Sequence, residues 1–355
     1  MSTRGFTTRR RALLVLALLA FAALVVAAPL SAAKPTEFTV NPLVSDQPGV
    51  APVTDPDLVN AWGLTSSATS PWWVSENGTD KSTLYNGSGV KQGLIVSVAG
   101  GPTGAVFNPT AGFALPTGGK ALFLFDSEDG IVRGWNGAQG TTAIVVKDRS
   151  DVGAIYKGLA IADTANGPRL YAADFHNARI DVFDGSFGLV PNSGFDDPSL
   201  PAGFAPFNVQ VIGGRVFVSY AKQDADAEDE VAGQGLGRVD VYDLAGNLLG
   251  GITGHGQLNA PWGLATAPAS FGGFAGDLLV GNFGDGQINA FHEVGPGQFT
   301  HVGELRGSDD KPLAIDGLWA LQVSQGGNNG TAGQLFFTAG PDDETHGLFG
   351  TIAPS

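Results

Sequence analysis

Hydrophobic positions along the chain fall in short segments separated by polar, glycine-rich turns, and this pattern repeats about every 50 residues. An apolar strand-like segment that ends in an aromatic residue recurs six times, at Tyr85, Trp135, Phe183, Tyr242, Phe291 and Phe349. A second marker precedes each aromatic residue, as in Trp62-Gly63-Leu64, Gly158-Leu159-Ala160, Trp262-Gly263-Leu264 and Gly317-Leu318-Trp319. Two independent markers therefore predict six repeated units.

The third unit displays its strands most clearly. Its apolar segments cover residues 158–162, 169–174 and 178–183, and each is bounded by Gly, Pro, Asn or Asp. In the last segment Ile180 and Val182 alternate with polar residues, as in a strand with one buried face. Units of this length with three or four strands are typical of propeller blades. We therefore expect an all-β, six-bladed β-propeller that occupies residues 34–355 as a single domain.

The sixth unit lacks a fourth strand. Its predicted strands cover residues 317–324, 334–339 and 347–352, whereas residues 37–41 are strand-like and belong to no unit. Pairing of residues 37–41 with the sixth unit would leave no exposed sheet edge. The sequence thus predicts a ring closed by its N-terminal strand.

Composition excludes several classes of protein. The chain has no Cys, which removes disulfide frameworks, thiol nucleophiles and thiolate metal sites. Its formal net charge of −15 argues against a nucleic-acid partner, because phosphate binding needs a positive field. A hydrophobic content of 43% excludes a disordered chain.

The first 33 residues have the order of a secretory signal peptide. Arg9-Arg10-Arg11 precede a charge-free run from Ala12 to Ala28, Pro29 ends that run, and Ser31-Ala32-Ala33 offers small residues to a signal peptidase. An uncleaved anchor is the alternative, although 17 residues fall short of the roughly 20 that span a bilayer. Thr8-Arg9-Arg10 also resembles a twin-arginine signal. We expect cleavage near Ala33 and a soluble, exported protein without a stable membrane span, located in the periplasm, in the medium or at the cell surface.

An acidic segment, residues 221–237, interrupts the fourth unit. Its acids are Asp224, Asp226, Glu228, Asp229 and Glu230, and Lys222 is its only base. The segment is either a calcium-binding loop or a solvated, mobile excursion between two strands. It lacks the regular ligand spacing and central glycine of an EF-hand loop, which favours the excursion.

Two stretches of the chain resemble NHL repeats. One covers residues 169–185, and the other runs from Pro261-Trp262-Gly263-Leu264-Ala265 through residues 277–288. More broadly, residues 40–352 resemble a family of exported bacterial propeller proteins with no assigned activity, notably at residues 60–64, 82–87 and 259–289. The resemblance implies an NHL-like propeller fold. It implies little about chemistry, since propellers include enzymes, binding proteins and scaffolds.

Polar residues near the strand ends would converge on one mouth of the central channel of such a ring. The candidate metal ligands among them are Glu76, Asp126, Asp174, Asn208, Asn282 and Asp316. Oxygen ligands suit Ca²⁺, and a metal held in this way polarises an ester and lowers the pKa of bound water. Lactonase-type six-bladed propellers resemble this arrangement in general form. The alternative, favoured by the recurrence of such residues in nearly every unit, is that they bond their own turns.

Two further sets of residues are candidates for chemistry or binding. Asp174 and His176 form the best local acid–base pair, although both also suit hydrogen bonds within a turn. Trp62, Trp262 and Trp319 occupy matching positions of three units. They would either stack on a sugar or apolar ligand in the channel, or pack between blades, and packing is favoured because aromatic residues dominate core burial.

Two functions follow from these residues. The favoured one is a non-catalytic binding or scaffold protein, because no catalytic constellation is stronger than turn chemistry. Its partner would be an extracytoplasmic protein, a glycan or a small molecule. The alternative is a Ca²⁺-assisted lactonase- or esterase-like hydrolase, or a lyase, with its site at the channel mouth.

Overall fold

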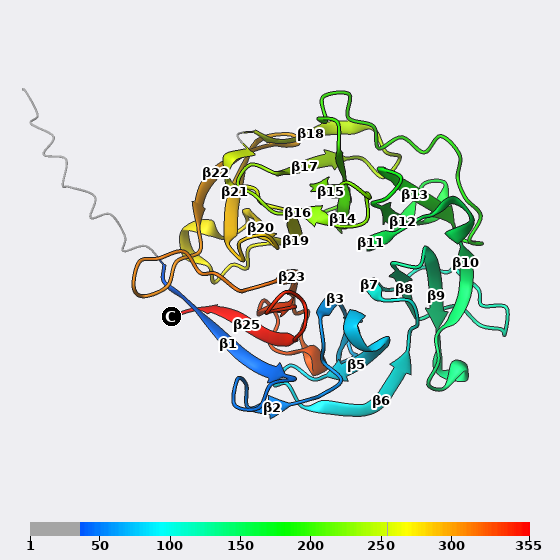
Figure 1. The fold of residues 1–355 in the computed structure, drawn as a ribbon, viewed down its shortest axis with the longest axis horizontal. Helices are drawn as coiled ribbons and strands as arrows, with labels where there is room; N and C mark the ends of the chain where they lie inside the picture. The colour runs from blue at the N-terminus through cyan, green and yellow to red at the C-terminus, as the bar shows by residue number, and fades with distance from the viewer. Residues whose placement is uncertain (1–35, 254) are drawn as a thin grey trace, which may run out of the picture. The chain divides into compact units, whose positions relative to one another are not determined.

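Six blades of mostly antiparallel strands, formed by five sheets, surround a central axis in the computed structural model of the protein (Figure 1). The structure describes residues 36–253 and 255–355; the predicted signal peptide, residues 1–33, lies outside the described residues. Residues 36–355 form one unit. The prediction of an all-β, six-bladed propeller is confirmed.

The first three blades follow one another along the chain, each built from its innermost strand outward. Blade 1 contains β3 (Ala61–Thr65), β4 (Trp72–Glu76), β5 (Lys81–Tyr85) and β6 (Lys91–Ser97). Blade 2 contains β7 (Pro102–Phe107), β8 (Phe123–Ser127), β9 (Ile131–Trp135) and β10 (Ile144–Asp148). Blade 3 has three strands, β11 (Tyr156–Thr164), β12 (Gly167–Asp174) and β13 (Arg179–Asp184).

The next two blades are joined at their outer edges. Blade 4 contains β14 (Phe204–Ile212), β15 (Arg215–Gln223), β17 (Gly237–Tyr242) and β18 (Leu248–Thr253), with the short β16 (Glu230–Val231) paired to β15. Blade 5 contains β19 (Pro261–Thr266), β20 (Leu278–Asn282), β21 (Ile288–Gly295) and β22 (Gln298–Glu304). The outermost strands β18 and β22 pair in parallel, so the two blades share one sheet.

The N-terminal strand closes the ring, as predicted. Blade 6 contains β23 (Leu318–Val323), β24 (Leu335–Ala339) and β25 (Leu348–Pro354), and β1 (Phe38–Ser45) is its outermost long strand. β1 runs antiparallel to β25, with Phe38 opposite Pro354 and Ser45 opposite Leu348, and the short β2 (Val53–Thr54) pairs with β1. Short 3₁₀ turns occur at Asn77–Thr79, Gly137–Gln139, Ser150–Val152, His255–Gln257, Gly272–Phe274 and Gly327–Asn329.

Blade 3 lacks a fourth strand, and a long connection follows its last one. Residues 185–203 link β13 to β14, and Phe195 of this connection packs against Tyr171 and Tyr242 with ring centroids 5.5 and 5.1 Å apart. The connection therefore bridges blades 3 and 4 and buries apolar side chains of both.

Every innermost strand has an irregular register near its start, where it pairs with the second strand of its blade. Such bulges re-aim side chains. The first residue of the irregular stretch occupies an equivalent position in the six blades. In blade order, these residues are Trp62, Thr103, Lys157, Phe207, Trp262 and Trp319. Aligning the units on this bulge shifts the sixth repeat marker from Gly317-Leu318-Trp319 to Trp319-Ala320-Leu321.

A small residue follows the bulge in most blades because the innermost strands approach one another closely. A Cβ atom on Gly63 would lie 2.3 Å from the backbone oxygen of Thr103, and one on Gly158 would lie 2.4 Å from Oδ1 of Asn208. In blade 4 the same position is Asn208, whose side-chain amide donates to the backbone oxygen of Trp262 at 2.7 Å. The Trp-Gly-Leu markers in the sequence thus record contacts between neighbouring innermost strands.

Candidate functional site

Aromatic side chains fill the centre of the ring. Trp62 and Trp319 stack with ring centroids 3.6 Å apart, and Trp262 packs against both of them. Phe207, from the opposite side of the ring, lies 5.8 Å from Trp319. Trp62 and Trp319 are fully buried, whereas Trp262 also borders the cavity described below. Of the three candidate stacking residues, only Trp262 is therefore placed to touch a bound ligand.

A buried lysine lies where the innermost strands begin. Lys157 is 1% exposed, and its Nζ lies 2.5 Å from Oε1 of Glu128 and 2.9 Å from Oδ1 of Asp229. The ammonium group also lies over the Trp62 ring, 5.3 Å from its centroid. The backbone oxygen of Lys157 accepts a hydrogen bond from Nε1 of Trp262 at 2.8 Å. One residue of blade 3 thus contacts blades 1, 2, 4 and 5.

Hydrogen bonds extend this network to blade 6. Asn60 accepts from Nε1 of Trp319 at 2.8 Å and donates to Oε2 of Glu344 at 2.6 Å. Asn77 donates to Oε2 of Glu128 at 2.9 Å. This polar network, which we call the lysine network, covers the aromatic centre at one end of the axis.

The acidic segment, residues 221–237, supplies part of this cover. Asp229 pairs with Lys157, β16 adds to the sheet of blade 4, and the backbone oxygen of Ala227 lies 3.2 Å from Nδ1 of His176. Asp226 and Glu228 are exposed. The side chain of Asp229 is itself 72% exposed, so the segment is solvated there and is also attached to the ring through Lys157 and β15.

Burial changes the titration of the carboxyl groups around Lys157. Burial raises the pKa of Glu230 to about 8, although the nearby Lys157 lowers it, and burial likewise raises the pKa of Glu344. Burial alone would lower the pKa of Lys157, but the carboxylates of Glu128 and Asp229 raise it above its ordinary value. Lys157 is therefore charged in this network throughout the physiological range.

A cavity of about 530 Å³ lies at the other end of the axis, where the innermost strands finish. Its walls come from all six innermost strands and include Leu64, Val106, Leu159, Val211 and Val323. Trp72 and Trp262 also border it. None of its 22 lining residues is an acid, a base or a histidine. We call this space the inner-strand cavity.

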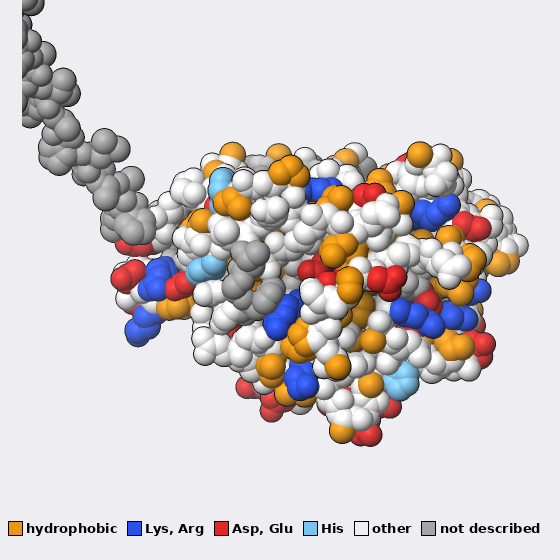
Figure 2. Space-filling view, turned by 90° about the horizontal axis from the view of Figure 1, so that it is seen from above, with side chains coloured by type: hydrophobic (Ala, Val, Ile, Leu, Met, Phe, Trp, Pro, Cys, Tyr) orange, Lys and Arg blue, Asp and Glu red, His pale blue; other side chains and the backbone are white. Residues whose placement is uncertain are grey.

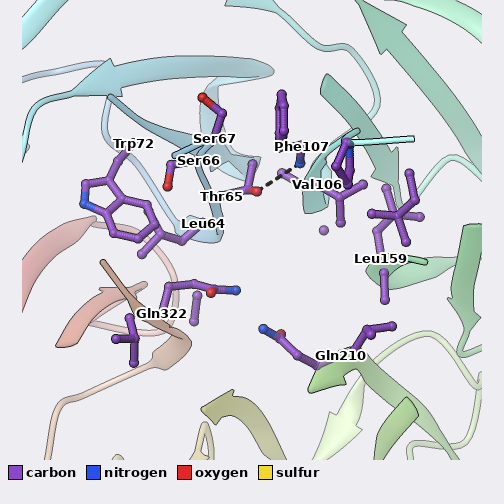
Figure 3. A pocket seen from close by; sticks show the side chains of 18 of the residues that line it. Leu64, Thr65, Ser66, Ser67, Trp72, Val106, Phe107, Leu159, Gln210 and Gln322 are labelled. Carbon is purple, nitrogen blue, oxygen red and sulfur yellow. Dashed lines mark hydrogen bonds between the residues drawn. The ribbon is translucent and has the colours of Figure 1, made fainter. Parts of the chain in front are cut away.

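Two glutamine side chains point into the inner-strand cavity (Figure 3). Gln210 comes from β14 and Gln322 from β23, and both are partly exposed. Neither side-chain amide has a hydrogen-bond partner among the residues that the structure describes, whereas Oγ1 of Thr65 accepts from the backbone N–H of Phe107 at 3.0 Å. Each free amide offers two donors and one acceptor oxygen to a ligand.

The first three metal-ligand candidates are buried within different blades. Glu76 accepts a hydrogen bond from Oγ1 of Thr83, and burial raises its pKa well above the ordinary range. Asp126 accepts from the backbone N–H of Gly104 at 2.7 Å, and burial raises its pKa to about 7. Asp174 accepts from Nδ2 of Asn177 at 2.9 Å, and burial raises its pKa as well.

The other three candidates also bond within their own surroundings. Asn208 donates to Trp262, Asn282 donates to the backbone oxygen of Gln257 at 2.8 Å, and Asp316 accepts from the backbone N–H of Asp342 at 2.9 Å. Among residues 36–253 and 255–355, no three His, Asp or Glu side chains are grouped as metal ligands. Each of the six candidate side chains thus forms hydrogen bonds within its own surroundings, and their convergence on a shared metal ion stays a prediction.

Asp174 and His176 bond to different groups. Asp174 accepts from the turn residue Asn177 and pairs with Arg179 at 3.1 Å, while the ring of His176 faces the backbone of the acidic segment. The structure does not join them in an acid–base pair.

Sequence reasoning missed Lys157, Gln210 and Gln322. Alignment of the repeat markers on their glycines would have placed Lys157 at the position of Trp62 and Trp262, as a lone charge among aromatic residues. No local motif marks the two glutamines, because their common position depends on the closure of the ring.

Charged side chains of both signs are interspersed over the side of the molecule that Figure 2 shows. In the described part of the chain, no helix has the length and apolar character needed to cross a bilayer.

Comparisons with known proteins identify relatives of unassigned activity. No family model matches the sequence. Two uncharacterized proteins of Acanthamoeba polyphaga mimivirus are each 33% identical to it, over 89% and 88% of this chain and 80% and 85% of the relatives. These relatives are viral, whereas the motifs described above resemble an exported bacterial family.

Solved structures share the fold at low identity. A protein of unknown function from Bacteroides thetaiotaomicron is 12% identical with a TM-score of 0.57, over 89% of this chain and 76% of that one. A streptogramin B lyase is 11% identical with a TM-score of 0.50, over 90% and 98% of the two chains. Similarity at this level concerns the six-bladed propeller fold alone.

Proposed function

The chain belongs to the same family as the two uncharacterized mimivirus proteins, and we propose that it is an exported, non-catalytic binding protein. Its ligand is an uncharged glycan or small molecule held in the inner-strand cavity. The observation that carries this proposal is the lining of that cavity, which combines aliphatic walls, aromatic rings and free amides with no ionisable group.

The lining favours binding over acid–base or metal chemistry. General acid–base catalysis needs a titratable group within hydrogen-bond reach of the reacting atom, and Ca²⁺ needs several oxygen ligands. The buried carboxyl groups of Glu76, Asp126 and Asp174 do not border the cavity. Apolar walls with a few placed polar groups are the usual composition of ligand pockets.

Polar side chains from three blades border the cavity and can orient a bound ligand. The amides of Gln210 and Gln322 reach it from blades 4 and 6, while Ser66 and Ser67 border it from the first blade (Figure 3). A sugar or a neutral amide-containing molecule presents hydroxyl or carbonyl groups to such amides and an apolar face to Leu64 and Trp262.

The proposal of export rests on residues 1–33, in which a basic region is followed by an apolar region and then by small residues. N-terminal sequencing of protein recovered from outside the expressing cells tests it. We expect a mature terminus near Lys34; a full-length terminus in the membrane fraction would instead identify an uncleaved anchor.

The ligand class is tested by titration of tryptophan fluorescence, because Trp72 and Trp262 border the cavity. The probes are cellobiose, maltose and chitobiose, with methyl glucoside and methyl glucuronide as a pair that differs in charge. We expect a neutral probe to bind and the uronate to bind more weakly, since the cavity provides no cation to pair with a carboxylate.

Gln210→Leu and Gln322→Leu keep the approximate side-chain size and remove the amide. Each should weaken a bound probe about tenfold, which corresponds to one lost hydrogen bond of about 1.4 kcal/mol. Gln92→Leu, on the outer strand β6, is the matched control and should leave binding unchanged. Hydrolysis of lactones or esters that is lost in Asp126→Asn would contradict the proposal and favour the hydrolase.

A further inference from the structure

A second pocket lies between blades 3 and 4 and shares no lining residue with the inner-strand cavity. It has a volume of about 510 Å³ and is bordered by β12, β13, turns of both blades and the connection of residues 185–203. The backbone N–H of Val190 on this connection donates to the oxygen of Val182 at 2.8 Å, which attaches it to blade 3. The backbone N–H of Phe195 donates to the oxygen of Gly246 at 2.8 Å, which attaches it to blade 4. We call this space the blade 3–4 pocket.

One wall of the blade 3–4 pocket is apolar. Tyr171, Val182 and Phe195 line it with buried side chains, and Val190 and Leu244 line it with partly exposed ones. The hydroxyl group of Tyr171 donates to the backbone oxygen of Leu244 at 2.8 Å, so it already has a partner. Aromatic and aliphatic side chains of this kind cover the apolar body of a small ligand.

Arg169 borders the same pocket without a carboxylate partner. Its Nη1 donates to the backbone oxygen of Pro168 at 2.9 Å, and no ion pair joins its guanidinium to an acid among the described residues. Asp184 lies opposite Arg169 in the register of β12 and β13. Its Oδ1 instead accepts from the backbone N–H groups of Ser186 at 2.8 Å and Gly188 at 2.9 Å. The guanidinium therefore keeps most of its five N–H donors for a ligand.

The next blade contains an equivalent arginine that does have a partner. Arg169 directly precedes the residue that pairs with Phe183, and Arg215 directly precedes the residue that pairs with Tyr242. Phe183 and Tyr242 are the repeated aromatic residues of blades 3 and 4, so the two arginines occupy equivalent positions. Nη1 and Nη2 of Arg215 donate to the two carboxylate oxygens of Glu293 at 2.6 and 2.9 Å. Bidentate pairs of this kind are strong and fix the geometry of both groups.

The carboxylate in that pair comes from the following blade. Glu293 lies two residues after Phe291, the repeated aromatic residue of blade 5. In blade 4 the residue two positions after Tyr242 is Leu244, which borders the blade 3–4 pocket. The position that would supply Arg169 with a carboxylate therefore carries an apolar side chain, and both residues border an open space.

We propose that the blade 3–4 pocket binds a small monocarboxylate with an apolar body, such as an arylalkanoic acid. The ligand carboxylate accepts from Arg169 in the way that Glu293 accepts from the equivalent arginine of blade 4. The apolar body packs against Tyr171, Phe195 and Leu244. This site is separate from the inner-strand cavity, whose lining residues include no cation.

A second charge in the pocket favours a monoanion over a dianion such as phosphate. The side chain of Asp243 borders the pocket, and its Oδ1 accepts from the backbone N–H groups of Ala245 at 2.8 Å and Asn247 at 2.9 Å. These bonds hold the carboxylate in its own turn. Its negative charge would repel the second charge of a dianion.

Calorimetric titration of the full chain with 3-phenylpropionate tests the proposal. The alcohol 3-phenylpropan-1-ol lacks the charge, and acetate lacks the apolar body. We expect saturable binding of 3-phenylpropionate and affinities at least about tenfold lower for both control compounds, because each lacks one of the two contacts. Binding of the alcohol as tightly as the acid would contradict a role for the arginine.

Two variants locate the site. Arg169→Gln should weaken binding of 3-phenylpropionate at least about tenfold, because the charge-assisted hydrogen bonds are lost. Leu244→Glu introduces a carboxylate at the position that Glu293 occupies in blade 5, so it should pair with Arg169 and abolish binding. This variant also provides the test if Arg169→Gln fails to fold. Leu244→Gln, which has a similar size and no charge, should bind within a few-fold of the wild type.

Arg306→Gln is the matched control, since Arg306 is 40% exposed and does not line the pocket; it should bind as the wild type does. Binding that survives Arg169→Gln, or equal binding by Leu244→Glu and Leu244→Gln, would overturn the proposal. Neither result would bear on the neutral ligand of the inner-strand cavity, because none of these residues borders that cavity.

Discussion

Replacement of Lys157 by Met is the sharpest test of how the ring is held at its centre. Methionine keeps most of the stem, which packs under Trp62, and removes the ammonium group. The change breaks contacts of 2.5 Å with Glu128 and 2.9 Å with Asp229, and it leaves Glu230 and Glu344 in a cluster without a cation.

The expected loss of unfolding free energy depends on how exposed the two carboxylate partners of Lys157 are. Removing one partner of a fully buried ion pair costs about 3–5 kcal/mol of unfolding free energy. The side chains of Glu128 and Asp229 are 34% and 72% exposed, so water can solvate them once the lysine is gone. With the lost cation–π contact included, we expect a loss of about 2–3 kcal/mol.

The loss should depend on pH. The pKa of Glu230 is raised to about 8 in the folded protein, so the stability that this group contributes is present below its ordinary pKa and is lost as pH rises towards 8. Lys157 lowers that pKa, and its removal raises it further. The destabilisation in Lys157→Met should therefore be larger at pH 8 than at pH 5.

Urea unfolding followed by tryptophan fluorescence measures both effects. Lys311→Met is the matched control, because Lys311 pairs with Asp309 at 3.2 Å but is 79% exposed. An exposed pair of this kind contributes about 0–1 kcal/mol. If Lys157→Met lost no more stability than Lys311→Met, or lost the same amount at both pH values, the account of the lysine network would be refuted.

Two other changes probe the close approach of the innermost strands and the metal hypothesis. Gly63→Ala should destabilise the protein by about 1–3 kcal/mol, because its Cβ would lie 2.3 Å from a backbone oxygen. Gly93→Ala is the control, since its Cβ enters open space and should not destabilise the protein. Equal urea midpoints of the two variants would contradict this prediction. Addition of Ca²⁺ or EDTA should leave the melting temperature unchanged, because the six candidate ligands already bond within separate surroundings. A ligand at 100 times its Kd adds about 2.7 kcal/mol, so a clear Ca²⁺-dependent rise would restore the hydrolase hypothesis.

The fold could be predicted from the sequence because the residues that repeat along the chain occupy equivalent positions in every blade. The aromatic residues from Tyr85 to Phe349 all lie on the third strand of their blades, although Phe291 lies within its strand and Phe349 near the start of its strand. The segment from Glu37 to Asn41 had no other sheet to join. The first feature is a local strand pattern, and the second is the one sheet edge that the sixth unit leaves without a partner strand. They do not require knowledge of any distance across the ring.

The candidate site could not be predicted in the same way. A bulge adds residues to one strand and shifts the register, so the equivalence of Lys157 with Trp62 and Trp319 was hidden by a shift of one or two positions. The acids at the ends of the second strands were read as converging groups. In the structure their side chains form hydrogen bonds within the protein; Asp126, for example, accepts from the backbone N–H of Gly104. The sequence pattern does not distinguish an acid that is bonded in this way from an acid that binds a metal.

The lysine network and the inner-strand cavity lie at opposite ends of one aromatic core, and their chemistry differs for a physical reason. Lys157 needs carboxylates because its charge is buried, so that end holds Glu128, Asp229 and Glu344 in a network of ion pairs and hydrogen bonds. The cavity end contains no charge to neutralise, which leaves the amides of Gln210 and Gln322 free. A ligand that enters the cavity therefore meets unused donors and acceptors over the indole of Trp262, whose Nε1 is fixed by the backbone of Lys157. Because that hydrogen bond links the two ends, loss of the lysine network should loosen the cavity floor and weaken ligand binding before the ring unfolds.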